Sequence, residues 1–235
     1  MNMPKYKRVL LKLSGEALKN SSEDIIDYEV AQKIALQIKK CIDDGTSFGI
    51  VIGGGNIFRG AGKKIERTSA DKMGMLATLM NSLAFQSVLE DVGVKTVVMT
   101  SLAMPQVADP FNALKAREAL DEGKAVIIAG GPGNPYFSTD TASVLRALEI
   151  EADAALFAKN VDGVYTADPR KDPNAKKLDE VTYSDILKND LAVIDLTASA
   201  MGKVNGVPVI IFALNEEDSI YRVINGEKMG TVVKN

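Results

Sequence analysis

The feature that most constrains this chain is a repeated alternation of two kinds of segment. Short apolar stretches, several of which end in glycine, alternate with longer stretches whose apolar residues recur at helical spacing. The strand-like stretches are residues 8–13, 48–52, 94–100, 125–129, 154–158, 207–212 and 231–233, and the helix-like stretches are residues 28–43, 72–91, 113–120, 139–148, 184–189, 198–204 and 217–224. Strands that alternate with helices favour an α/β fold, in which a mostly parallel central sheet is flanked by helices on both faces.

The length of the chain suits one large domain, because 235 residues fall near the upper end of the usual domain size. Residues 159–177 are polar and rich in turn-forming residues, so they are the best internal boundary. We therefore expect a single domain over residues 1–235, with a longer N-terminal lobe of about residues 1–158 and a smaller C-terminal lobe of about residues 159–235.

The scarcity of histidine and cysteine excludes several kinds of active site and metal site. The chain has no histidine and a single cysteine, Cys41, which excludes Ser-His-Asp triads, histidine-ligated metals and cysteine-rich zinc sites. Cys41 lies in an apolar helical stripe and is expected in the core.

The 28 basic and 31 acidic residues give a net charge of −3, which argues against nucleic-acid or membrane binding. The N-terminus lacks a signal-peptide layout and the longest apolar run, residues 206–214, is short, so we expect a cytoplasmic protein.

Charged residues and glycines gather where the predicted strands end. Ligands of doubly wound sheets bind outside the carboxyl ends of the strands, and glycine turns there let backbone N–H groups approach phosphate oxygens. Lys12 lies in an otherwise apolar strand, and a buried lysine is rare unless it is paired or functional. Together with Arg59 and Lys159 it predicts a polyanion-binding site at this edge of the sheet. Asp140 either belongs to that site or caps the helix that starts beside it.

Such a site favours phosphoryl transfer, which requires mainly positioning and charge neutralisation. If the acceptor is itself a phosphate, its oxygen is already anionic at pH 7 and no general base is needed. The absence of histidine from the sequence is compatible with that chemistry.

Five stretches, taken together, resemble the uridylate kinases of the amino-acid-kinase superfamily. They read KLSGEAL from residue 12, GGGNIFRG from residue 53, ADKMGMLATLMN from residue 70, GNPYFSTDT from residue 133 and VDGVYTADPRKDP from residue 161. The last stretch indicates the superfamily, and the second and third indicate the uridylate branch. The resemblance implies a three-layer αβα fold and the reaction ATP + UMP → ADP + UDP, with Mg²⁺ accompanying ATP.

The resemblance also assigns roles to residues, with the acceptor in the N-terminal lobe and ATP in the C-terminal lobe. It places catalysis on Lys12, Arg59, Asp140 and Lys159, with no direct protein ligand for the metal. The expected ATP-binding residues are Lys12, Ser14, Gly15, Gly55, Arg59, Lys159, Asn160, Tyr165 and Asp168. The expected UMP-binding residues are Gly54, Asp71, Gly133, Asn134, Pro135, Tyr136, Phe137, Ser138 and Thr139. Asp195 is expected to cap the next helix rather than to act in catalysis.

Assembly and regulation are further implications of the resemblance. It implies a homohexamer, with the helix over residues 73–88 as a candidate interface, and inhibition by UTP. Regulation by GTP stays open, because residues 19–24 read KNSSED where the family often carries a glycine-rich stretch. The segment between Arg59 and Asp71 is also short for the family, and the helix after Asp195 lacks the usual arginine-containing pattern.

Two other functions remain as alternatives. One is a kinase of the same superfamily whose acceptor is a carbamate, a carboxylate or a small phosphate. The other is a nucleotide sensor or storage protein that binds ATP without turnover. Arg59 and Asp71 together favour a ribonucleotide acceptor, and the joint presence of Lys12, Asp140 and Lys159 favours catalysis.

Overall fold

A computed structural model describes residues 4–19, 24–60, 64–167, 172, 174–189, 191 and 193–235. Within these described residues the main sheet has nine strands and confirms the expected mostly parallel α/β fold. In spatial order the strands are β4 (Asp109–Pro110), β3 (Thr96–Thr100), β5 (Ala125–Ala129), β2 (Ser47–Ile52), β1 (Arg8–Leu13), β6 (Ala154–Lys159), β10 (Val209–Ala213), β11 (Thr231–Lys234) and β9 (Glu180–Thr182). The described pairings within it are parallel except that of β10 with β11.

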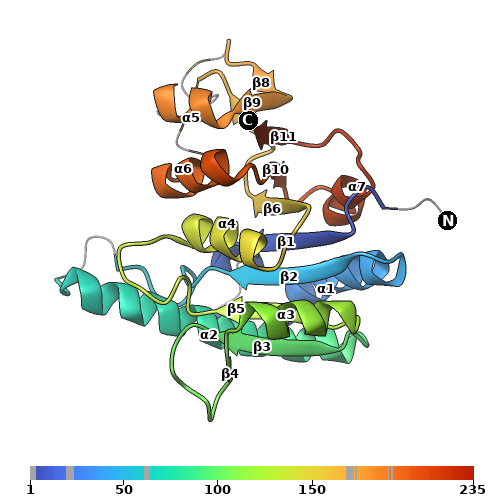
Figure 1. Cartoon of the computed structure of the whole chain (residues 1–235), viewed down its shortest axis with the longest axis vertical. Coiled ribbons are helices and arrows are strands. Elements are labelled where there is room, and N and C mark those ends of the chain that lie inside the picture. Colours follow the sequence, from blue (N-terminus) through green and yellow to red (C-terminus); the bar gives the residue numbers. More distant parts are fainter. Residues whose placement is uncertain are drawn as a thin grey trace.

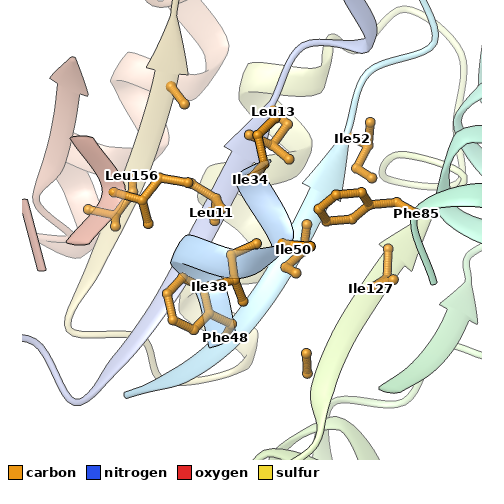
Figure 2. Packing of buried hydrophobic residues seen from close by; sticks show 14 of the residues in the cluster. Leu11, Leu13, Ile34, Ile38, Phe48, Ile50, Ile52, Phe85, Ile127 and Leu156 are labelled. Carbon is orange, nitrogen blue, oxygen red and sulfur yellow. The ribbon is translucent and has the colours of Figure 1, made fainter. Parts of the chain in front are cut away.

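Helices cover both faces of this sheet, which gives three layers (Figure 1). One face carries α1 (Tyr28–Asp43), α2 (Arg67–Asp91) and α7 (Ser219–Ile224), and the other carries α3 (Ala113–Asp121), α4 (Thr139–Glu149), α5 (Tyr183–Asn189) and α6 (Leu196–Asn205). Each face has its own apolar cluster, and alternate residues of β1 enter the two clusters. Figure 2 shows Leu11 and Leu13 on the α1 side, beside Ile34 and Ile38. Leu10 belongs to the opposite cluster, so Lys12 shares the α4 side of the sheet.

Cys41 is fully buried in the α1 cluster, as its place in the apolar stripe predicts. Burial raises the pKa of its thiol to about 12, so it is an inert core residue rather than a nucleophile.

The start of α2 corrects the sequence-based prediction. The helix begins at Arg67 rather than at Lys72, because the Glu66 carboxylate accepts hydrogen bonds from the backbone N–H groups of Thr68 and Ser69. Those two hydrogen bonds lower the pKa of Glu66 to about 2. The first turn is polar, so the apolar periodicity does not reveal it. Asp71 consequently lies in the second turn and is not a helix cap.

The apolar pattern of the sequence does not predict several short helices and strands. A single-turn helix, η1 (Gly15–Leu18), follows β1, and the polar stretch after residue 159 contains the strand pair β7 (Val164–Tyr165) and β8 (Lys177–Leu178). Strands β4 and β9 have only two and three residues, too few for alternation to identify them. The main sheet continues through β6 into β10, and the division into two lobes stays a prediction. In the described part of the chain no helix is long and apolar enough to cross a membrane.

Gly230 offers a test of backbone packing at the start of β11. Its φ is +76°, and an added Cβ would lie 1.9 Å from the carbonyl oxygen of Ile211. Gly206 has nearly the same φ, +74°, but an added Cβ meets its nearest atom only at 4.0 Å. We expect Gly206→Ala to cost about 1–2 kcal/mol of unfolding free energy for its left-handed backbone, and Gly230→Ala to cost about 2 kcal/mol more. Urea unfolding measures both, and equal losses would contradict the steric argument.

Candidate active site

Three charged side chains meet where β1, β6 and α4 come together. The Lys12 Nζ lies 2.9 Å from Asp140 Oδ1, and the Lys159 Nζ lies 3.3 Å from Asp140 Oδ2. Lys159 also donates to the carbonyl oxygen of Val193. All three side chains are at least four-fifths buried, and the helix cap of α4 is Ser138, not Asp140. The capping interpretation of Asp140 is therefore wrong, and its carboxylate instead bridges two lysines.

The pKa shifts in this cluster have identifiable causes. Burial by itself would raise the pKa of Asp140, but the positive charges of Lys12 and Lys159 outweigh it, and the pKa is lowered. Burial lowers the pKa of Lys159, and its attraction to Asp140 and Asp195 offsets only part of that effect. Lys12, Asp140 and Lys159 together carry two positive charges and one negative charge, so an anionic ligand can complete the charge balance.

The lowered pKa of Asp140 predicts how stability depends on pH. The unfolded carboxyl, with a pKa of about 3.9, takes up its proton before the folded one does as the pH falls, so the stabilisation is present above that pH and is lost below it. Asp140→Asn lacks this titration. We expect wild type to exceed Asp140→Asn in unfolding free energy at pH 6 and the gap to shrink below pH 4. Denaturant titrations over pH 2.5–7 measure it, and a gap that stays constant would contradict the assignment.

The glycine turn after β2 is held by a pair of amides that sequence reasoning missed. Asn56 and Asn81 exchange hydrogen bonds of 3.0 and 2.7 Å, and Asn81 also donates to the carbonyl oxygen of Gly53 at 2.7 Å. Asn81 is fully buried in α2. A Cβ on Gly54 would lie 2.7 Å from the carbonyl oxygen of Gly74, so glycine is required there. The motif quoted from residue 70 contains Asn81, but its position within an apolar helical pattern gives no signal of this contact.

A cavity of about 300 Å³ lies between this turn, α2 and the loop before α4. Its lining comprises Gly54, Gly55, Phe58, Gly60, Ala70, Asp71, Gly74, Met75, Thr78, Gly131, Pro132, Asn134, Phe137, Ser138 and Thr139. The structure thus brings together most of the residues expected around the acceptor. Gly133, Pro135 and Tyr136 belong to the same loop but do not line the cavity.

Asp71 connects α2 to the loop of residues 133–138, which precedes α4. Its Oδ2 accepts hydrogen bonds of 2.8 Å from Arg67 Nε and from the backbone N–H of Tyr136. Burial would raise the pKa of Asp71, but the hydrogen bonds from Arg67 and Tyr136 more than compensate, and the pKa is lowered. Tyr136 has a φ of +71° and its ring lies 5.4 Å from the Arg67 guanidinium. An ionised Asp71 therefore both borders the cavity and restrains a backbone conformation that non-glycine residues seldom adopt.

Described members of the expected ATP-binding set follow the ends of β1, β2 and β6. Ser14 caps η1 by accepting from Ala17, and Asn160 directly follows β6. Arg59 is exposed and forms an ion pair with Glu16. Tyr165 donates to Asp162 at 2.9 Å, and Asp168 lies outside the described residues. A second cavity, of about 660 Å³, lies between η1, α1 and the loop after β10, and Glu16 and Asn160 line it.

Asp195 caps α6, as the sequence predicts, by accepting from the backbone N–H of Ala198 at 2.8 Å. Its carboxylate also accepts from the Ser138 hydroxyl and, at 3.0 Å, from the Thr141 hydroxyl. Asp195 therefore ties α6 to the first turn of α4, the turn that carries Asp140. The sequence shows the cap but not the second helix that the same carboxylate holds.

These observations define a class: a mostly parallel α/β protein with two buried lysines and an aspartate at its strand ends and a cavity lined by the residues that precede the aspartate. The sequence matches the amino acid kinase family over residues 7–213, and the chain belongs to that family.

Solved structures of kinases share the whole fold. The UMP kinase of Bacillus anthracis is 39% identical with a TM-score of 0.94, over 97% of this chain and 96% of that one. The UMP kinase of Ureaplasma parvum is 33% identical with a TM-score of 0.92, over 98% and 100%. The uridylate kinase of Archaeoglobus fulgidus is 25% identical with a TM-score of 0.76, over 96% and 99%. At these identities the chain resembles the three kinases in sequence as well as in fold.

Proposed function

We propose that the chain is a cytoplasmic UMP kinase that makes UDP from ATP and UMP for pyrimidine nucleotide synthesis. The observation that carries the proposal is the buried cluster of Lys12, Asp140 and Lys159, in which Asp140 directly follows Ser138 and Thr139 of the 300 Å³ cavity lining. Similarity to two UMP kinases along nearly the whole chain supports the choice of acceptor.

The reaction is an in-line displacement. A phosphate oxygen of UMP forms a bond to the γ-phosphorus of ATP, while the bond from that phosphorus to the bridging β–γ oxygen breaks and ADP leaves. The UMP oxygen is already anionic at neutral pH, so no group has to remove a proton. Lys12 and Lys159 neutralise charge on the transferred group, and Asp140 holds both ammonium groups in place. Arg59, which pairs with Glu16 in this structure, would have to leave that partner to contact the phosphates.

The described residues contain no cluster of three or more metal-ligating side chains. Mg²⁺ is commonly held by substrate phosphates and water with one or two carboxylates, and the cluster supplies one carboxylate, Asp140. When bound with ATP, Mg²⁺ would reduce the negative charge of the phosphates. Asp140 is the carboxylate of the cluster that would help to orient the ion, and both of its oxygens contact lysine ammonium groups.

An acceptor panel tests the proposed function. ADP release is measured with ATP, Mg²⁺ and, in separate reactions, UMP, CMP, dUMP, carbamate, acetate and inorganic phosphate. We expect UMP to give the highest kcat/KM and one UDP per ADP. Turnover with carbamate or a carboxylate alone would support the alternative kinase, and ATP binding without turnover would support a sensor.

Regulation is part of the proposal, with UTP as an inhibitor that occupies the uridine site. Because KNSSED replaces a glycine-rich stretch, we expect GTP to change activity by less than about fivefold, which is weaker than the usual allosteric coupling of about 1–3 kcal/mol. Residues 20–23 of this stretch lie outside the described residues. Titration of GTP at fixed ATP and sub-saturating UMP measures the effect, and activation of tenfold or more would contradict it.

We also propose that the chain forms a homohexamer in which α2 contributes an interface. Met73, Leu76 and Met80 are 41%, 43% and 52% exposed and follow one another at helical spacing along α2. Analytical ultracentrifugation is expected to show a hexamer for wild type and a smaller species for Leu76→Glu. Lys39→Glu, on the exposed side of α1, is the control. A monomeric wild type, or a hexamer that survives Leu76→Glu, would contradict this interface.

A further inference from the structure

The turn between β5 and α4 is unusual in its backbone. Gly130, Gly131 and Gly133 have φ values of +78°, +57° and +89°, so glycine meets a conformational requirement at each of them. Gly131 and the following Pro132 line the 300 Å³ cavity. Three glycines within four residues lose much conformational freedom on folding, so contacts from elsewhere must hold the shape of the turn.

One such contact comes from a buried arginine on α4. Arg146 is 4% exposed, and its Nη2 donates to the carbonyl oxygen of Gly131 at 3.0 Å and to the Ser101 hydroxyl at 2.7 Å. Ser101 itself donates to the same Gly131 carbonyl at 2.9 Å. On the opposite side of the turn, the N–H of Gly130 donates to the Thr78 hydroxyl at 2.8 Å. The turn is therefore held from both α4 and α2.

The rest of the Arg146 environment compensates the buried guanidinium at every nitrogen except Nε. Nη1 pairs with Glu149, and the guanidinium carbon lies 4.1 Å from the centre of the Phe111 ring. Nε is buried and has no hydrogen-bond partner within the described parts of the chain. Apolar residues of similar volume are often at least as stabilising as buried ion pairs, so stability alone does not favour arginine at this position.

We propose that Arg146 is a positioning residue for acceptor binding: its guanidinium fixes the Gly131 carbonyl and thereby the shape of the turn that lines the acceptor cavity. The inference rests on the proposed function, because that function makes the cavity the UMP site. Arg146 lies behind the turn and does not line the cavity, so it acts through Gly131 and Ser101.

Arg146→Lys and Arg146→Met in the full chain test this role. A lysine keeps the charge, but its single ammonium cannot reproduce the planar fork that reaches Glu149, Ser101 and Gly131 together. We expect either variant to raise the KM for UMP and the Kd of UMP measured calorimetrically without ATP by about tenfold, because a small misplacement of a binding group has a large kinetic effect. The KM for ATP and kcat at saturating UMP should stay within about twofold of wild type.

Glu149→Gln is the matched control, because it removes the ion pair and leaves both contacts to the turn. It should lower the melting temperature without changing the KM for UMP. If both Arg146 variants fail to fold, Ser101→Ala decides, with an expected rise of about threefold in the KM for UMP. An unchanged KM and Kd for UMP in the folded variants would overturn the inference alone. A wild-type chain that neither binds nor phosphorylates UMP would overturn the proposed function and the inference with it.

Discussion

Replacing Lys12 by Met is expected to lower kcat by about 100-fold or more while UMP affinity falls by less than about fivefold, because an interaction made mainly in the transition state contributes to rate rather than to binding. Lys12 is 8% exposed, is held 2.9 Å from Asp140 and projects from the end of β1 toward the same cluster as Lys159. Methionine keeps most of the side-chain length and removes the ammonium. The measurement is kcat with saturating substrates, together with the Kd of UMP.

Lys39→Met is the control for this variant, because Lys39 pairs with Asp43 on the exposed surface of α1. It removes one positive charge far from the cluster and should leave kcat unchanged. A folded Lys12→Met enzyme that keeps near-normal kcat would show that Lys12 is a structural strand residue and that the phosphate site lies elsewhere.

Asp71→Ala is expected to remove most of the preference for UMP over dUMP. A carboxylate that accepts a hydrogen bond from the ribose 2′-hydroxyl loses that bond with the deoxy sugar, and such a site can discriminate by about 100-fold or more in kcat/KM. The same carboxylate restrains Tyr136, so Asp71→Ala should also raise the KM for both acceptors, whereas the KM for ATP should change little. Asp71→Asn should be intermediate. The ratio of kcat/KM for UMP and dUMP separates sugar recognition from loop restraint.

Arg67→Gln provides the control for sugar recognition. It removes the ion pair with Asp71, whose Nε–Oδ2 distance is 2.8 Å, and leaves the carboxylate and its hydrogen bond to Tyr136. The UMP/dUMP ratio should survive this change. If Asp71→Ala lowers the melting temperature and leaves the ratio intact, Asp71 only restrains the loop, and the sugar is recognised by other residues around the cavity.

The central strands were predictable from the sequence because their burial requires apolar side chains at consecutive positions. Strands that are buried on both faces of a parallel sheet consist of short apolar runs. Glycines in the sequence mark where several of these runs end. Lys12 was predictable as a candidate functional residue because it is a charged residue within such an apolar run. The start of α2 was missed because Glu66 caps a polar turn, which carries no apolar periodicity. Strands β4 and β9 depend on pairing partners distant in sequence rather than on a pattern of their own.

The supporting contacts of the site were not predictable, because each joins residues that are distant in the chain. The Asn56–Asn81 pair, the bridge from Asp195 to α4 and the contact of Arg146 with Gly131 all depend on how helices pack over strand ends. In the sequence, Asn81 and Arg146 sit within helical patterns whose neighbours are apolar. Only the three-dimensional arrangement shows that they hold the turns on which the cavity depends.

The central claim is that a nucleoside monophosphate and ATP meet across the cluster of Lys12, Asp140 and Lys159. A crystal structure of the chain with UMP and a non-hydrolysable ATP analogue tests it most directly. We expect the UMP ribose beside Asp71 in the 300 Å³ cavity, its phosphate at the Gly54–Gly55 turn, and the terminal phosphate of the analogue within about 3 Å of the two lysine ammonium groups. UMP bound in the 660 Å³ cavity beside α1, or an analogue whose phosphates lie away from both lysines, would contradict the account.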